Sequence, residues 1–177
     1  MPVRHVIVDR DGVLNHEDPN GGYVLRPEDW VWIDGSVAAL KDLRQAGFVV
    51  SVATNQSAVG RGLLERSVLD AIHLHIVRDA GVEAIFACPH APDDGCACRK
   101  PAPGLLHQAI AWAGVPASET VFIGDAQRDV DAARAAGVRP IVVRTGKGAR
   151  TEAASKDEVE VFDDLRAVVA ALKRSAR

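Results

Sequence analysis

The sequence has few aromatic residues, few cysteines and no long apolar run. Aromatic side chains make up 5% of the 177 residues although 47% are hydrophobic, so Val, Ile, Leu and Ala must build the core. Such a core is typical of a sheet buried under helices. The N-terminus has no apolar stretch of the length that a signal peptide or a transmembrane helix needs, which predicts a cytoplasmic protein.

The chain also lacks a strong excess of either charge. It has 24 acidic and 21 basic residues and a net charge of -3, which gives no electrostatic reason to expect a nucleic-acid or membrane partner. The three cysteines are an odd number and lie within eleven positions, unlike a disulfide framework. No repeat or low-complexity segment divides the chain. We therefore expect one domain over residues 1–177, and a monomer.

Short segments rich in β-branched residues alternate with segments of helical periodicity. This alternation predicts a three-layer, Rossmann-like α/β fold around a parallel sheet, with right-handed crossovers. The expected strands are 6–8, 48–53, 84–87, 120–123, 141–143 and 159–162. The expected helices are 36–46, capped by Ser36 and ended by Gly47, then 67–80, 106–113, one that carries Asp129, and one near 165–172. The polar segment 16–29 is expected to be a loop over the strand ends, too short for a cap domain.

Polar residues gather where the expected strands end. They are Asp9 and Asp11 after the first strand, Thr54, Asn55, Gln56 and Ser57 after the second, Lys100 before the third helix, and Asp125 and Asp129 after the fourth strand. In an open parallel sheet these ends face one crevice, where ligands bind. Each residue also has a structural interpretation, such as a helix cap for Thr54 or a surface charge for Lys100.

Taken together, the motifs resemble those of the haloacid dehalogenase-like phosphohydrolases. The matching features are DxDG at 9–12, Thr54, Lys100, and GDxxxD at 124–129. The resemblance implies Mg²⁺-dependent hydrolysis of phosphate monoesters. The residues support it, because Asp9 and Asp125 would form a negative pocket that a hard cation such as Mg²⁺ can neutralise.

The resemblance also implies roles for the individual residues. Asp9 would attack phosphorus and form an aspartyl-phosphate, and Asp11 would act as general acid and then base. Asp9, Asp125 and the backbone carbonyl of Asp11 would hold Mg²⁺, with Asp129 behind them rather than on the metal. Thr54 and Asn55 can donate hydrogen bonds to phosphoryl oxygens, and Lys100 supplies positive charge.

A second group of residues uses every cysteine in the chain. Cys88, His90, Cys96 and Cys98 form a CxH…CxC pattern in one short loop. Four such ligands are typical of a closed, structural Zn²⁺ site, and the loop has almost no apolar residues that could order it without metal. The alternative is three reduced cysteines that are merely neighbours. Because Lys100 lies two residues after Cys98, zinc would also help to place the lysine.

Longer motifs narrow the resemblance to the heptose bisphosphate phosphatases, over nearly the whole chain. They are DRDGVLN, TNQSAVGRG, CPH…CxCRKPAPG, GDAQRD and RTGK. This resemblance implies removal of the 7-phosphate from D-glycero-D-manno-heptose 1,7-bisphosphate. It also implies that Arg99 recognises the substrate and that Gly22, Tyr23, Gln56 and Ser57 contact the sugar. Two departures are the short spacing between His90 and Cys96, and Ala126 where such enzymes often carry Lys or Ser.

Three alternatives remain open at this point. Histidinol-phosphate phosphatases share the zinc loop. A phospho-acceptor signalling domain also places aspartates, a Thr and a Lys at strand ends, but a CxH…CxC loop has no role there. A zinc-stabilised binding domain without catalysis would not need Asp9, Asp11, Lys100 and Asp125, which are all present.

Overall fold

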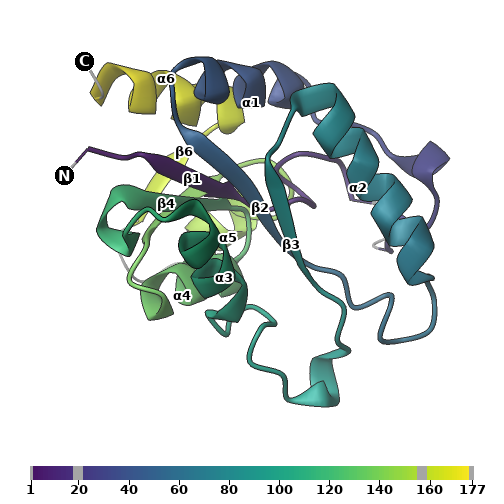
Figure 1. Cartoon of the computed structure of the whole chain (residues 1–177). Helices are drawn as coiled ribbons and strands as arrows, with labels where there is room; N and C mark the ends of the chain where they lie inside the picture. Colours follow the sequence, from purple (N-terminus) through teal and green to yellow (C-terminus); the bar gives the residue numbers. More distant parts are fainter. Residues whose placement is uncertain (1, 18–21, 155–158, 176–177) are drawn as a thin grey trace.

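A six-stranded parallel sheet forms the centre of the computed structural model, which describes residues 2–17, 22–154 and 159–175. The strand order is β3-β2-β1-β4-β5-β6 (Figure 1). The strands are β1 (His5–Val8), β2 (Val49–Asn55), β3 (Ala84–Cys88), β4 (Thr120–Gly124), β5 (Arg139–Val143) and β6 (Glu160–Phe162). Every neighbouring pair is parallel, so the predicted fold class is confirmed.

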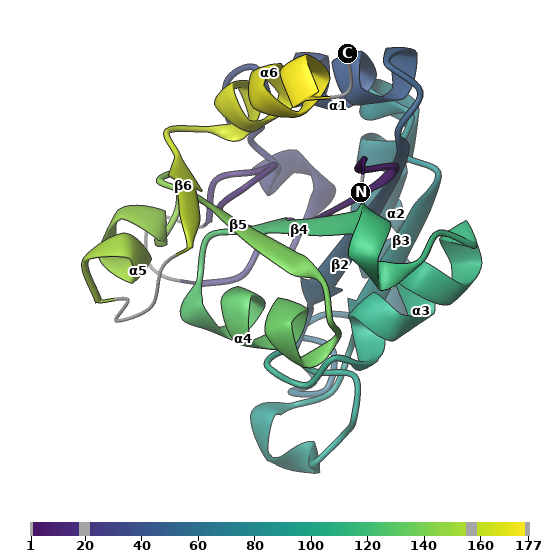
Figure 2. The same ribbon diagram turned by 90° about the vertical axis from the view of Figure 1, so that its left-hand side faces the viewer.

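Helices cover both faces of the sheet (Figures 1 and 2). They are α1 (Ser36–Gln45), α2 (Arg66–Ala80), α3 (Gly104–Ala113), α4 (Gln127–Ala135), α5 (Gly148–Ala154) and α6 (Leu165–Ser175), with 3-10 turns η1 (Pro27–Asp29), η2 (Pro92–Asp94) and η3 (Ala117–Glu119). One core cluster joins α1, α2 and α6 to one face of the sheet, and a second joins α3 and α4 to the other. These helices are too short or too polar to cross a bilayer within the part of the chain that is described.

β1 lies inside the sheet between β2 and β4, and both of its faces are covered. Val6 and Val8 point into the first core cluster and Ile7 into the second, and all three are 0% exposed. Burying a Val or Ile side chain stabilises a fold by about 1.5–3 kcal/mol. A continuous β-branched run is the sequence pattern that this position requires.

The strand order reverses at β1. The chain passes from β1 to β2 and β3 on one side, then returns to place β4 on the other side of β1. Val8 is in register with Val52 of β2 and Ile123 of β4, so the three strands end close together. In open α/β sheets, ligands bind beyond the carboxyl ends of strands at such a reversal.

Several boundaries differ from the prediction. β2 runs on to Asn55, so Thr54 and Asn55 belong to the strand rather than to the loop after it. The prediction that Ser36 caps α1 is wrong. The Ser36 hydroxyl donates to the carbonyls of Leu14 and Ile33, and Gly35 takes the cap position with a φ of 77°. The polar helix α5 was not predicted, because within it only Gly148 and Thr151 are buried and no apolar periodicity marks it.

Part of the segment that was expected to be a loop, 16–29, lies outside the described residues, namely positions 18–21. Its described part contains the single turn η1.

Candidate active site

Asp9 lies immediately after β1 and is 2% exposed. Its backbone N–H donates to the carbonyl of Ile123 at 2.8 Å, which ties it to β4. One carboxylate oxygen accepts the N–H of Arg10 at 2.7 Å, and the other lies 2.9 Å from Nζ of Lys100. Burial raises the pKa of Asp9 to about 6, although the Lys100 charge opposes that rise.

Lys100 is a fully buried cation in this site. Its ammonium group lies 2.9 Å from Asp9 and 2.8 Å from Asp129, and it donates to the carbonyl of Ala53 at 3.0 Å. Three acceptors therefore meet its three N–H groups. Burial lowers the pKa of Lys100, but the charges of Asp129 and Asp9 raise it by more, so the lysine stays charged.

Asp129 supports the turn between β4 and α4. Its Oδ2 accepts the backbone N–H groups of Asp125 at 3.3 Å and Ala126 at 3.0 Å, while Oδ1 faces Lys100. Oδ2 thus accepts two hydrogen bonds, whereas the buried Oδ1 has the ion pair with Lys100 and no hydrogen-bond partner among the described residues. The supporting role of Asp129 behind the metal ligands stays a prediction, because its carboxylate also lies within 4.8 Å of those of Asp9 and Asp125.

Asp125 has one oxygen with a partner and one without. Oδ2 accepts the backbone N–H of Lys147 at 2.8 Å, whereas Oδ1 is buried and has no hydrogen-bond partner in the part of the chain that the structure describes. Burial, followed by the nearby charge of Asp9, raises the pKa of Asp125 to about 7. Gly12 and Gly146 pack so closely that a Cβ on either would collide with this carboxylate, and both have positive φ angles of 84° and 58°.

These features fit a divalent cation. Carboxylate oxygens of Asp9, Asp125 and Asp129 lie within 4.8 Å of one another. An unpaired buried oxygen and two raised carboxyl pKa values are the features that a hard cation with oxygen ligands would relieve. The donor set therefore suits Mg²⁺, through Asp9 and Asp125.

Asp11 opens onto a cavity, with 22% of its side chain exposed. Its Oδ1 accepts from Arg10 at 2.7 Å and from Asn15 at 3.0 Å, and its Oδ2 accepts from Gln56 at 2.8 Å. Burial alone would raise the pKa of Asp11, but the Arg10 charge and these hydrogen bonds together lower it. The group is thus held as a carboxylate.

The cavity at the strand ends has a volume of about 240 Å³. Its lining is Arg10, Asp11, Glu17, Gly22, Tyr23, Asn55, Ser57, Arg99, Arg128 and Lys147. It thus brings together five of the six residues expected to contact the substrate. A larger hollow of about 410 Å³ lies between α1 and α6, and none of the predicted site residues lines it.

Gln56 is the expected substrate residue that does not line this cavity. Its side chain is 1% exposed and donates to Asp11 and to the hydroxyl of Thr54. Tyr23 and Ser57, which were predicted from separate motifs, meet at 3.1 Å between their hydroxyls. The first loop is thereby tied to the end of β2.

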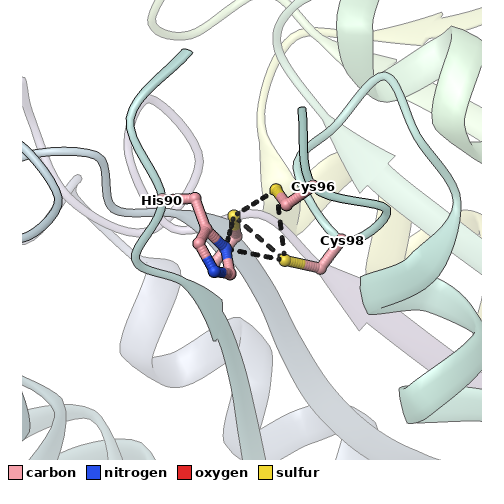
Figure 3. A group of neighbouring side chains, drawn as sticks. His90, Cys96 and Cys98 are labelled. Carbon is pink, nitrogen blue, oxygen red and sulfur yellow. Dashed lines mark hydrogen bonds between the residues drawn. The ribbon is translucent and has the colours of Figure 1, made fainter. Parts of the chain in front are cut away.

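The four soft ligands also come together (Figure 3). Sγ of Cys98 lies 3.2 Å from Nδ1 of His90, 3.2 Å from Sγ of Cys88 and 3.5 Å from Sγ of Cys96. Ligands at about 2.3 Å from a tetrahedral Zn²⁺ would be about 3.8 Å apart, so the cluster is close to the size of a zinc site. Burial and the neighbouring Cys98 raise the pKa of Cys88 to about 12, which a bound cation would reverse.

Sequence reasoning gave no role to several residues at the site. Arg128 and Lys147 line the cavity, Thr145 donates to the carbonyl of Gly12, and Thr151 donates to the carbonyl of Asp125. The sequence carries a signal for two of these residues, Thr145 and Lys147. The polar run 144–147 follows β5, and the strand-end rule that singled out Thr54 and Asp125 applies to it equally.

Comparison with known proteins agrees with the geometry. A family model described as HAD-hydrolase-like matches residues 97–168. The chain is 44% identical over 173 residues to the D-glycero-beta-D-manno-heptose-1,7-bisphosphate 7-phosphatase of Pseudomonas aeruginosa, which covers 94% of this chain and 96% of the relative. The enzyme of the same name from Bordetella bronchiseptica is 42% identical, and the match covers 97% of this chain and 98% of the relative.

Solved structures give the same result. The D,D-heptose 1,7-bisphosphate phosphatase of Bordetella bronchiseptica, complexed with magnesium and phosphate, superposes with a TM-score of 0.91 at 40% identity and covers 97% of this chain and 99% of that chain. The corresponding Burkholderia thailandensis protein has a TM-score of 0.72 at 34% identity, and the match covers 95% of this chain and 97% of that chain. This chain therefore belongs to the D-glycero-beta-D-manno-heptose-1,7-bisphosphate 7-phosphatase family of haloacid dehalogenase-like hydrolases.

Proposed function

We propose that this chain is a Mg²⁺-dependent phosphomonoesterase that removes the 7-phosphate of D-glycero-D-manno-heptose 1,7-bisphosphate. The observation that carries the proposal is the arrangement at the end of β1. There the Asp9 carboxylate lies 2.9 Å from the Lys100 ammonium and within 4.8 Å of a carboxylate oxygen of Asp125, and Asp11, two residues on, lines a small cavity with four cations. The names of the similar proteins supply the substrate.

The metal would be held by Asp9, Asp125 and the backbone carbonyl of Asp11. When bound, Mg²⁺ would offset the repulsion between the Asp9 carboxylate and the anionic phosphate ester. The same charge would remove the cost of burying Asp9 and Asp125 as neighbouring anions. The raised pKa values of both groups are the measure of that cost.

Asp9 is the nucleophile in this proposal. One carboxylate oxygen of Asp9 attacks phosphorus, the bond from phosphorus to the sugar oxygen breaks, and an aspartyl-phosphate forms. Asp11 gives a proton to the departing sugar oxygen and then takes one from the water that hydrolyses the aspartyl-phosphate. The carboxylate form in which Arg10 and Gln56 hold Asp11 suits the second step. For the first step, the approaching phosphate charge raises the pKa of Asp11.

Lys100 and Thr54 stabilise the transferred phosphoryl group. The buried Lys100 ammonium beside Asp9 supplies positive charge where negative charge gathers, and the Thr54 hydroxyl can donate to a phosphoryl oxygen. Gly22, Tyr23, Asn55, Gln56, Ser57 and Arg99 are the proposed substrate contacts. For Gln56 the contact is indirect, through Asp11 and Thr54.

Zn²⁺ is proposed as a structural ion held by Cys88, His90, Cys96 and Cys98. Four ligands close the coordination shell, so no position remains for water or substrate. The whole chain is proposed to work as a single domain and a monomer in the cytoplasm.

Phosphate release from a small substrate panel tests the function. The panel contains heptose 1,7-bisphosphate, histidinol phosphate and p-nitrophenyl phosphate, each with and without Mg²⁺. We expect the highest kcat/KM for the heptose bisphosphate, and none of the three turned over after removal of Mg²⁺. Faster hydrolysis of histidinol phosphate would favour the related phosphatase instead. A stably phosphorylated protein without turnover would favour a phospho-acceptor domain.

A further inference from the structure

Three guanidinium groups on the cavity wall, those of Arg10, Arg99 and Arg128, each keep a buried nitrogen atom without a hydrogen-bond partner in the described part of the chain. Nε of Arg128 and Nη1 of Arg99 are buried, and neither donates a hydrogen bond within the described residues. Both residues line the cavity that Asp11 faces. A buried N–H without an acceptor is unfavourable, so an acceptor from outside the chain is expected there.

The charges around the cavity do not balance. Four cations and two carboxylates line it. Arg10 pairs with Asp11, and Lys147 pairs with Glu17. The positive charges of Arg99 and Arg128 are therefore left over on the lining.

The acidic groups behind Arg128 do not use up its charge. Asp9 and Asp129 already face the Lys100 ammonium, and Asp9 with Asp125 would hold Mg²⁺ in the proposed function. Three carboxylates are then balanced by Lys100 and the divalent ion. The Arg128 charge remains for a ligand in the cavity.

We propose that Arg128, together with Arg99, binds the phosphate of the substrate that is not hydrolysed. This inference rests on the proposed function, in which a sugar bisphosphate places one phosphate at Asp9 and carries the second into the cavity. Arg128 lies in the first turn of α4, and Arg99 follows the cysteine cluster directly, so they approach the cavity from different segments. Guanidinium groups bind phosphate oxygens through paired N–H donors. Arg128 thus selects for a bisphosphate over a monophosphate.

The test compares two substrates that differ only in the second phosphate. Heptose 1,7-bisphosphate and heptose 7-phosphate are hydrolysed with saturating Mg²⁺, and the ratio of their kcat/KM values is measured for wild type and for Arg128→Gln. The ratio should fall at least tenfold, which corresponds to about 1.4 kcal/mol of lost binding to the second phosphate. A change at the metal or the nucleophile would affect both substrates and cancel in the ratio.

Arg66→Gln is the matched control, because Arg66 pairs with Asp70 on the surface of α2, away from the cavity. Arg66→Gln should leave the kcat/KM values for both heptose substrates unchanged. Arg128→Lys keeps the positive charge but not the planar guanidinium group, so the ratio of the two kcat/KM values should fall by less than in Arg128→Gln. If Arg128→Gln does not fold, Arg128→Lys replaces it as the test. A ratio in Arg128→Gln that falls less than tenfold would overturn the inference while the proposed function stands. A wild-type protein that is inactive on both heptose substrates would overturn the proposed function and this inference together.

Discussion

The side-chain amide of Asn55 holds the backbone of Lys100 through two hydrogen bonds. Oδ1 of Asn55 accepts the backbone N–H of Lys100, and Nδ2 donates to its carbonyl oxygen, each at 3.0 Å. Asn55 is the last residue of β2, so the pair fixes the loop that carries Lys100 to the sheet. The position of the Lys100 ammonium beside Asp9 therefore depends on an anchor 45 residues earlier in the chain.

Asn55→Ala should lower kcat by about 10- to 10²-fold, because a shift of about 1 Å in a catalytic group can cost that much. Steady-state kinetics on the heptose bisphosphate would measure the loss. Lys100→Ala, which removes the charge itself, gives the reference for a full loss. If Asn55→Ala raised KM and left kcat intact, Asn55 would act through its proposed substrate contact alone, and its anchoring of Lys100 would not matter for catalysis.

Asp9→Asn should abolish turnover and leave the protein folded. The substitution keeps the shape of the side chain and removes the nucleophilic carboxylate, while Lys100 still pairs with Asp129. Phosphate release and the thermal unfolding midpoint are measured together. Activity near the wild-type level in this variant would contradict the nucleophile assignment.

Asp11→Asn should lower kcat by about 10²- to 10⁴-fold, the range for a lost general acid or base. Asn15→Ala is a useful comparison, since it removes one hydrogen bond to Asp11 and leaves the carboxylate in place. It should have a much smaller effect. A loss below tenfold in Asp11→Asn would show that another group moves the proton.

Cys96→Ser and Cys98→Ser should lose zinc and, with it, most activity at saturating Mg²⁺. Only one residue separates Cys98 from Lys100, so a loosened cluster displaces the lysine without removing a catalytic group. Elemental analysis gives the metal content, and circular dichroism reports on the core, which should stay folded. Full stoichiometric zinc in both variants would refute the ligand set. Zinc-free wild-type protein with full activity would refute the coupling to Lys100.

Without Mg²⁺, the protein should lose stability between about pH 4 and pH 7 through Asp9 and Asp125. The pKa values of these carboxyls are raised to about 6 and about 7, so the folded state favours their protonated forms. Their stabilising contribution is complete below their unfolded pKa of about 3.9 and is lost as the pH rises through the folded values.

Asp125→Asn isolates this effect, because other titrating groups are common to both proteins. The unfolding midpoint of Asp125→Asn relative to wild type should rise as the pH is taken from 5 to 7.5 without Mg²⁺. Excess Mg²⁺ should stabilise the wild type increasingly over the same range and the variant little. A midpoint difference that does not change with pH would show that burial does not strain this carboxyl.

Much of the fold could be predicted, because its signals are local. The buried run at 6–8 and the glycines at 47, 81 and 114 mark a central strand and three helix ends from neighbouring residues alone. Thr54 and Asn55 were placed one step outside their strand, since a polar residue in a strand looks like the start of a loop until the partner strand is known. α5 has no apolar stripe, and without one a helix leaves no periodic signal.

The sequence by itself determined which chemical groups the protein has and roughly where they meet. The order of the motifs, the rule that parallel strands end at one edge, and the spacing of Cys88, His90, Cys96 and Cys98 were sufficient for that. Only the tertiary structure decided which partner each side chain takes. It turned Gln56 inward to Asp11, paired Asn55 with Lys100, and left Nε of Arg128 without a hydrogen-bond partner among the described residues. These outcomes depend on packing between segments far apart in the chain, where side chains compete for the same donors and acceptors, and no local pattern records which of them wins.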